Sequence, residues 1–260
     1  MAMEILQQLV TNLASGRIRI IDLTQTLSPD TPPIVLPPEA GQCRPFRMEE
    51  ISRYDERGLS YWNNFSCGEH TGTHFDAPIH WISGKDLPNN STDTIPLEHL
   101  IAPVCVIDCS RQTHADPDFL LTVDFVGRWE EEHGQIPRRS WVLMRTDWSK
   151  RTDPVEYQNL DEEGQHSPGP DAEVVQFLVH DRDVLGFGSE CIGTDAGQAF
   201  HLKPPYPCHY YMHGNGRHGL QCLTNLDRLP PQGAVIFCPP LKIRNGSGSP
   251  LRVLALVPEP

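Results

Sequence analysis

Histidine and acidic side chains are concentrated in one short segment, residues 69–80, which reads Glu-His-Thr-Gly-Thr-His-Phe-Asp-Ala-Pro-Ile-His. His70, His74, Asp76 and His80 are all even-numbered, so in an extended chain their side chains would project to one face. Two neutral imidazoles and one carboxylate leave coordination positions open around a cation and suit Mn²⁺, Zn²⁺ or Fe²⁺. This segment therefore predicts a catalytic site for one divalent metal ion.

The same segment must bend if its side chains are to meet at one point. Ten residues of straight strand span roughly 33 Å, whereas ligands lie about 2.0–2.3 Å from a bound ion. Gly72 permits tight backbone geometry and Pro78 removes a donor from the strand ladder, so the chain is able to fold at both positions. A bound ion would acidify water and polarise a carbonyl group, which favours hydrolysis.

Two other interpretations of this segment are open. The histidines could be solvent-facing or supporting groups in a polar loop. Two histidines and a carboxylate also describe the facial triad of non-haem iron oxygenases. That triad normally draws its last histidine from far along the chain, and the sequence identifies no such residue.

Length, composition and charge exclude several classes of protein. With 260 residues, 38% hydrophobic and 21% charged, we expect a single globular domain spanning 1–260. The net charge of −13 argues against nucleic acid and against an anionic membrane as partners. We expect neither a signal peptide nor a membrane span. The eight cysteines include no C-x-x-C pair, and those within apolar runs read as buried thiols, so we expect a cytoplasmic protein.

Short apolar runs and a few helices must position the site. Two helices are predicted at 122–133, which ends at Gly134, and at 171–180, which begins after Pro170. An amphipathic helix is predicted at 1–15. Strict alternation of strands and helices is absent, so the pattern indicates a mixed α/β class and not a doubly wound nucleotide fold. The predicted strands are Ile18–Asp22, Val104–Asp108, Trp141–Arg145, Val184–Phe187, Ala234–Cys238 and Val253–Val257.

The spacing His-x-Gly-Thr-His-x-Asp-x-Pro-x-His over residues 70–80 resembles the signature of the cyclase-like metal-dependent hydrolases, in particular the mononuclear, isatin hydrolase-like branch. The resemblance covers most of the chain. It implies a single-domain swivelling β/β/α fold with mixed sheets and few helices. It also implies a homodimer or homotetramer, in which the helix at 1–15 is a candidate oligomer contact.

The resemblance also assigns roles to the residues of the signature. It implies that His70, His74 and Asp76 are metal ligands. His80 would be the general base or a group that acts through a water molecule. The implied reaction is hydrolysis of the amide bond of a formamide or a cyclic amide.

One position departs from the two-zinc formamidases, which place a bridging Glu where this chain has Gln221. A neutral amide bridges two cations badly but can donate its oxygen to one. We therefore expect one ion per subunit, with Gln221 as fourth protein ligand, Mn²⁺ favoured and Zn²⁺ as the alternative. The other interpretation of Gln221 is a surface amide. His209 is expected to contact substrate or shuttle a proton, with His213 as the competing choice.

Three aromatic side chains near the signature are candidate contacts for a flat ring substrate, although core packing explains them equally well: Phe65, Phe75 and Trp81. Glu69 is odd-numbered and is expected to point away from the metal. Asp195 is expected to orient a loop or an imidazole.

These observations favour an amidohydrolase that cleaves a C–N bond of a small cyclic amide or imide of the isatin type, with His80 or His209 handling protons. The first alternative is an arylformamidase acting on N-formyl kynurenine. The second is a non-hydrolytic metal-binding or lyase-like protein on the same scaffold.

Overall fold

A computed structural model of the protein describes residues 2–36, 41–81 and 87–259. A curled, mixed sheet of nine strands forms its centre, and six α-helices occur in these ranges. The order of the strands across the sheet is β1 (Ile18–Asp22), β15 (Leu254–Pro258), β13 (Ala234–Phe237), β5 (Ile101–Asp108), β7 (Trp141–Arg145), β11 (Gly186–Ser189), β12 (His218–Gln221), β4 (His74–Asp76) and β14 (Gly248–Pro250).

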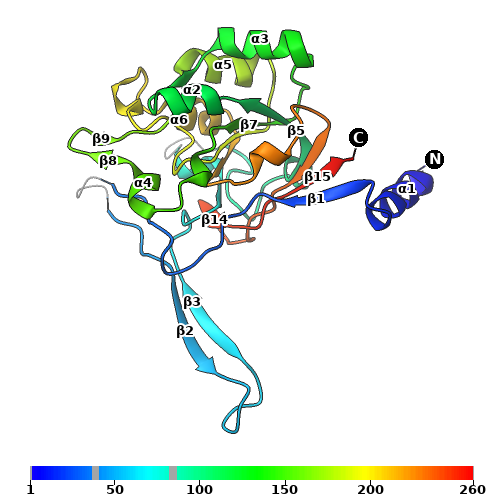
Figure 1. The fold of residues 1–260 in the computed structure, drawn as a ribbon, viewed down its shortest axis with the longest axis vertical. Coiled ribbons are helices and arrows are strands. Elements are labelled where there is room, and N and C mark those ends of the chain that lie inside the picture. Colours follow the sequence, from blue (N-terminus) through cyan, green and yellow to red (C-terminus); the bar gives the residue numbers. More distant parts are fainter. Residues whose placement is uncertain (1, 37–40, 82–86, 260) are drawn as a thin grey trace.

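Four neighbouring strands of this sheet, β5, β7, β11 and β12, run parallel. The connections between them carry α3 (Val123–His133), α5 (Ala172–His180) and α6 (Pro207–Gly214), and α3 and α5 lie together over one face of the sheet (Figure 1). Shorter helices are α2 (Ser110–Ala115) and α4 (Pro154–Gln158). Three two-stranded ribbons complete the fold: β2 (Arg47–Ser52) with β3 (Trp62–Ser66), β6 (Leu120–Leu121) with β10 (Gly169–Pro170), and β8 (Leu160–Asp161) with β9 (Gly164–Gln165).

The central strands bury both faces, as alternation along β5 shows. Val104 and Val106 belong to a core enclosed by the curled sheet, together with Trp141 of β7. Cys105 and Ile107 face the opposite way and pack under the helices. Because successive side chains of a strand point to opposite faces, one apolar run contributes to two cores. The predicted burial of the Cys105 thiol is confirmed.

The helices predicted from the sequence are present with the expected caps. The Thr122 hydroxyl accepts a hydrogen bond from the backbone of Phe125 at the start of α3, and Gly134 ends that helix with a positive φ of 90°. The carboxylate of Asp171 accepts from Val174 at the start of α5. These caps satisfy backbone groups that a helix leaves unpaired at its ends. The N-terminal helix is also present, as α1 (Ala2–Ala14).

All six predicted strands occur, with bounds that differ by up to three residues. Three strands of the nine-stranded sheet were not predicted, β4, β12 and β14, and neither were the strands of the three ribbons. The three sheet strands are three or four residues long and include histidine, aspartate, glycine and proline, so they lack the apolar pattern that signals a strand. Pairing within the sheet stabilises them, and they form the edge on which the site is built.

Two elements extend away from the body of the protein, α1 and the β2–β3 hairpin (Figure 1). Large apolar side chains on both are exposed, including Leu6 on α1 and Phe65 on β3, each 65% exposed. None of the helices within the described ranges has the length and apolar character needed to cross a membrane. All eight cysteines are free, and six of them are buried.

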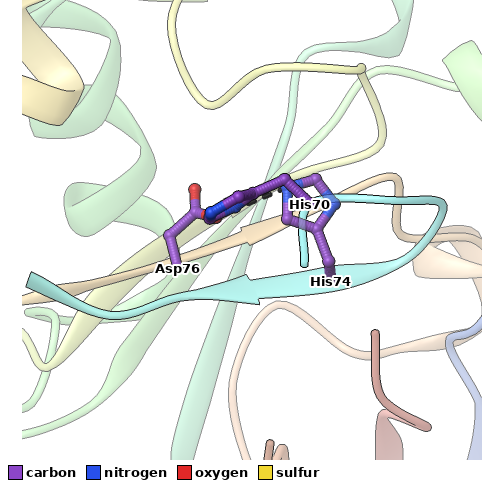
Figure 2. Close-up of side chains that lie close together, drawn as sticks. All are labelled: His70, His74 and Asp76. Carbon is purple, nitrogen blue, oxygen red and sulfur yellow. Dashed lines mark hydrogen bonds and ion pairs between the residues drawn. The ribbon is translucent and has the colours of Figure 1, made fainter. Parts of the chain in front are cut away.

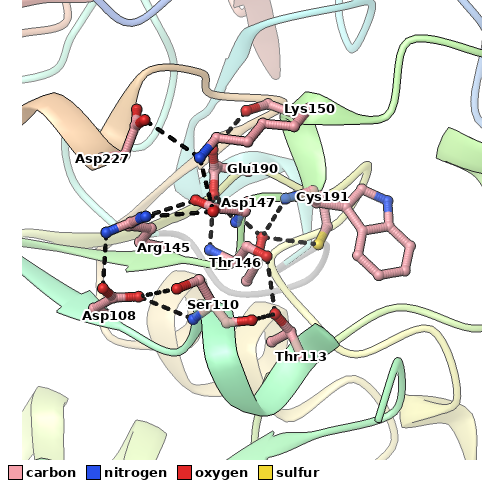
Figure 3. Close-up of polar contacts among 12 residues, drawn as sticks. Asp108, Ser110, Thr113, Arg145, Thr146, Asp147, Lys150, Glu190, Cys191 and Asp227 are labelled. Carbon is pink, nitrogen blue, oxygen red and sulfur yellow. Dashed lines mark hydrogen bonds and ion pairs between the residues drawn. The ribbon is translucent and has the colours of Figure 1, made fainter. Parts of the chain in front are cut away.

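A buried carboxylate, that of Glu190 at the end of β11, organises the adjoining loops (Figure 3). It accepts hydrogen bonds from the backbone N–H groups of Thr146, at 2.7 Å, and Asp147, at 2.6 Å, and from the Ser149 hydroxyl, at 2.6 Å. Burial raises the pKa of Glu190, and its effect is larger than the opposite effect of these hydrogen bonds. The backbone beside it, at Cys191, accepts from Cys222 N–H at 2.9 Å, so the network supports the segment that follows β12.

Candidate metal centre

The site is built on the short strand β4, whose side chains alternate between two faces. His74 and Asp76 share one face, and His74 Nε2 lies 3.4 Å from Asp76 Oδ1. In the antiparallel registers, Gln221 of β12 lies opposite His74, and Gly248 of β14 lies opposite Asp76. Residues opposite each other on paired strands have neighbouring side chains. The register therefore brings Gln221 to the same face as the two candidate ligands of β4.

His70 reaches this face because the chain turns before β4. Gly72 has a positive φ of 60°, a conformation that residues with a Cβ rarely adopt. The turn returns the His70 ring to Asp76, with 2.7 Å between His70 Nδ1 and Asp76 Oδ1 (Figure 2). The predicted bend at Gly72 is confirmed. At Pro78 the strand gives way to a 3₁₀ turn, Pro78–His80, which carries the last histidine of the signature.

Three imidazoles around Asp76 are held by groups that only accept hydrogen bonds. His74 Nδ1–H donates to the carbonyl oxygen of Gly72 at 2.7 Å, and His213 Nδ1–H donates to that of Arg217 at 3.0 Å. His209 Nδ1–H donates to the carboxylate of Asp195 at 2.5 Å. In a neutral ring one nitrogen carries the proton and the other has a free lone pair. The Nε2 atoms of all three rings are therefore available as ligands.

The residues satisfy the requirements of a divalent cation. Ligand atoms of His70, His74 and Asp76 lie within 4.8 Å of one another, and so do those of Asp76, His209 and His213. His213 Nε2 is buried and has no hydrogen-bond partner among the described residues. Buried polar groups are normally paired, so an unpaired lone pair beside a buried carboxylate fits a site for a cation.

Asp76 is fully buried and is the centre of the cluster. Burial by itself would raise its pKa, but the neighbouring His74 and His70 hold the pKa well below its usual value. The side-chain amide of Gln221, which is also buried, is in close contact with Asp76 Oδ2. The interpretation of Gln221 as a surface amide is therefore wrong.

Further histidines form one wall of the site. The His80 ring lies 3.9 Å from the His70 ring and 5.7 Å from that of His209, between centroids. Burial lowers the pKa of His80 to about 3. The pKa of His209 is raised instead, because the hydrogen bond and the charge of Asp195 outweigh the effect of burial. Burial therefore dominates the pKa shift of His80, and the neighbouring Asp195 dominates the opposite shift of His209.

His209 and His213 were competing choices, and the structure brings both to Asp76. His209 Nε2 lies 3.8 Å from Asp76 Oδ2, and the rings of His209 and His213 are 5.4 Å apart. Both are on α6, four residues apart, and therefore lie on the same side of that helix. The expectation that Asp195 orients an imidazole agrees with its contact with His209.

The three aromatic candidates have different positions. Trp81 is at the site, with its ring 4.9 Å from that of His209 and 38% of its surface exposed. The assignment of Phe75 as a substrate contact is wrong, because Phe75 points to the other face of β4 and is completely buried in the core beside Trp141. Phe65 lies on the β2–β3 hairpin and, within the described chain, its ring contacts Phe46 and none of the histidines.

Two side chains that adjoin His70 were not recognised from the sequence as part of the site. Ser247, 177 residues away, places its hydroxyl 2.9 Å from His70 Nε2, and no sequence signal indicates this contact. Glu69 contacts that same hydroxyl at 2.5 Å. The prediction that Glu69 points away was based on an extended chain, but residues 69–73 form bends and not a strand. The sequence signal for Glu69 was its position directly before His70, the first histidine of the signature.

Comparisons with known proteins identify the family of this chain. The family model described as "Putative cyclase" matches residues 21–196. A protein named isatin hydrolase from Roseibium aggregatum is 49% identical over 261 residues, covering 99% of each chain. A kynurenine formamidase from Salinibacter ruber is more distant, at 25% identity over 93% of this chain and 99% of its own.

Solved structures show the same relationship. Isatin hydrolase A from Labrenzia aggregata, bound to benzyl benzoate, is 61% identical with a TM-score of 0.95, covering 98% of this chain and 99% of its own. An isatin hydrolase bound to the product analogue thioisatinate is 48% identical with a TM-score of 0.97, covering 100% of both chains. The predicted α/β fold is confirmed by these matches. The protein therefore belongs to the cyclase family, in the group that includes the isatin hydrolases.

Proposed function

We propose that this protein is a hydrolase that opens the ring amide of isatin or of a closely related cyclic amide, using one divalent cation. The observation that carries the proposal is the convergence of imidazole lone pairs on the buried carboxylate of Asp76 next to the half-exposed ring of Trp81. The full-length similarity to proteins named isatin hydrolase supports this substrate class over a formamide.

We assign His70, His74, Asp76 and Gln221 as the residues that hold the cation. Their donor set combines imidazole nitrogens with carboxylate and amide oxygens, which favours Mn²⁺, with Zn²⁺ as the alternative. When bound, a divalent cation supplies Lewis acidity for the substrate carbonyl and for water. The hydrogen bond from His74 Nδ1–H to the carbonyl oxygen of Gly72 orients that ring before any cation arrives.

The remaining residues bind substrate and move protons. Trp81 offers a ring face on which a flat substrate would stack. Hydrolysis breaks the C–N bond, joins the water oxygen to the carbonyl carbon and leaves a proton on the nitrogen. We assign His80 to accept the proton from water, and His209, oriented by Asp195, to donate one to the leaving nitrogen. One proton then passes from His80 to His209, which returns both rings to their starting protonation states.

Substrate choice separates the leading function from the formamidase alternative. We expect purified protein loaded with Mn²⁺ to hydrolyse isatin, because the ring amide is planar and fits beside Trp81. We expect N-formyl kynurenine to be turned over at least about 100-fold less efficiently in kcat/KM, a difference of roughly 2.7 kcal/mol in transition-state stabilisation. Loss of isatin absorbance and release of formate are the two measurements.

The comparison is made with the same metal-loaded sample for both substrates, so that metal content cannot explain a difference. Equal efficiency on the two substrates, or a preference for the formamide, would overturn the proposal of a cyclic amide as substrate. Metal-loaded protein that opens neither substrate would support the non-hydrolytic alternative.

We propose further that the protein is a homo-oligomer, in its simplest form a homodimer, with the β2–β3 hairpin at the contact. Met48 pairs with Phe65 across the hairpin, and their side chains are 53% and 65% exposed. An isolated two-stranded ribbon is at best marginally stable in water. A second copy of the chain that covers these side chains would stabilise it.

Replacing both Met48 and Phe65 by Ser is expected to shift the protein from a multiple of the chain mass to the mass of one chain in light scattering. The matched control is Val155→Ser on α4, which removes an equally exposed apolar side chain away from the hairpin. A single-chain mass for the unaltered protein, or an unchanged oligomer in the double variant, would exclude the hairpin as the contact.

We also place the protein in the cytoplasm. All eight cysteines are free, which agrees with a reducing compartment.

A further inference from the structure

The ring of His70 is held differently from the other imidazole rings around Asp76. Its Nδ1 faces Asp76 Oδ1 at 2.7 Å, and its Nε2 lies 2.9 Å from the hydroxyl oxygen of Ser247. A hydroxyl is able to donate or to accept, whereas the carbonyl and carboxylate groups that hold His74 and His209 only accept. By itself, Ser247 would therefore leave the position of the proton on the His70 ring undecided.

Glu69 removes this ambiguity. The Ser247 hydroxyl lies 2.5 Å from Glu69 Oε2, and the backbone N–H of Ser247 also donates to that oxygen, at 3.2 Å. An ionised carboxylate only accepts, so the single hydroxyl proton of Ser247 goes to Glu69. The hydroxyl oxygen must then accept from His70 Nε2–H. In the neutral ring the lone pair is then on Nδ1 and faces the carboxylate of Asp76, which also only accepts, so a cation would be needed to stabilise these two facing acceptors.

The backbone fixes Ser247 in this position. Its carbonyl oxygen accepts from the N–H of Ala77 at 2.9 Å, immediately after β4. The next residue, Gly248, approaches the His70 ring so closely that a Cβ there would lie 2.5 Å from His70 Cε1. The pairing of β14 with β4 therefore holds Ser247 against the ring. Gly248 permits this close approach because it has no side chain.

We propose that Glu69 and Ser247 are positioning residues that fix the proton and the orientation of His70 for binding of the cation. This inference depends on the metal site of the proposed function. Without the two groups, the ring has no fixed partner at Nε2 and is free to rotate or to place its proton on Nδ1. Partners of metal-bound histidines commonly contribute about 10–100-fold to metal affinity.

The test measures Mn²⁺ binding to metal-stripped protein by calorimetry, together with the Tm of the metal-free form. We expect Ser247→Ala to raise the Kd for Mn²⁺ by about 10–100-fold. Glu69→Gln should raise it by a smaller factor, because the amide still accepts from Ser247 but no longer forces the direction of its proton. Ser247→Thr keeps the hydroxyl and should restore the affinity of the unaltered protein.

The matched control is Ser249→Ala, which removes a buried hydroxyl from β14 that contacts Leu241 and Pro250 instead of a histidine. This control should keep the Kd of the unaltered protein. The inference is overturned if Ser247→Ala and Glu69→Gln bind Mn²⁺ normally. It is also overturned if Ser249→Ala weakens binding as much as Ser247→Ala, since the effect would then be structural. Failure of the unaltered protein to bind Mn²⁺ would instead refute the proposed function.

Discussion

Asp76→Asn is expected to abolish tight binding of a divalent metal ion and, with it, hydrolysis of isatin. Asp76 is the one anionic group in the candidate ligand set, and the two histidines nearest to it lie 2.7 and 3.4 Å from its Oδ1 atom. Asparagine has the same shape but is neutral. We expect kcat/KM to fall by more than about 100-fold, because altering the mere partners of metal-bound histidines already costs about 10–100-fold in affinity or activity. Metal analysis and the isatin assay are made on the same sample.

Asp108→Asn is the matched control for this variant. It makes the same change at an exposed carboxylate that pairs with Arg145 at 2.7 Å on another part of the molecule (Figure 3). The control should retain metal and activity, since a half-exposed ion pair contributes little. Full metal content and normal turnover in Asp76→Asn would exclude Asp76 as the central ligand.

His80→Asn is expected to lower kcat for isatin by about 10²–10⁴-fold while metal content stays unchanged. Its imidazole lies against the ring of His70, but it is not part of either group of converging ligand atoms. Asparagine fills the position without a nitrogen that accepts a proton from water. Since binding of the ring substrate depends on Trp81 and the cation, KM should change much less than kcat.

The control for this second variant is His180→Asn, at the exposed end of α5. It should keep the kinetic constants of the unaltered protein. Loss of metal together with activity in His80→Asn would assign His80 to the ligand set. Unchanged kcat would remove His80 from the chemistry and leave His209 as the proton carrier.

The fold was predictable where the signal is local. The helices at residues 123–133 and 172–180 have an apolar stripe and a capping residue next to each other in the sequence. Two of the parallel strands, β5 and β7, have runs of apolar residues. The helix α6 was missed, although it carries His209 and His213, because its eight residues are rich in polar and aromatic groups. Burial against the sheet and α5 stabilises it, and a local pattern does not report such contacts.

The candidate substrate contacts also show that proximity along the chain is not sufficient to predict a side chain's position. The sequence places Phe75 between two ligands, and proximity along the chain suggested a role in binding. Strand geometry decides otherwise, because neighbouring residues of β4 point to opposite faces. Trp81, beyond the bend at Pro78, is directed to the histidines because the strand has ended.

The sequence by itself determined the chemistry of the protein: three histidines and an aspartate in eleven residues, with Gly72 and Pro78 where the chain must turn. Only the tertiary structure decided which other groups join them. Gln221 and Ser247 lie 145 and 177 residues from their partners, and they arrive through the pairing of β12 and β14 with β4. Such pairing depends on long-range packing of the whole sheet, whereas residue spacing reports only on neighbours along the chain.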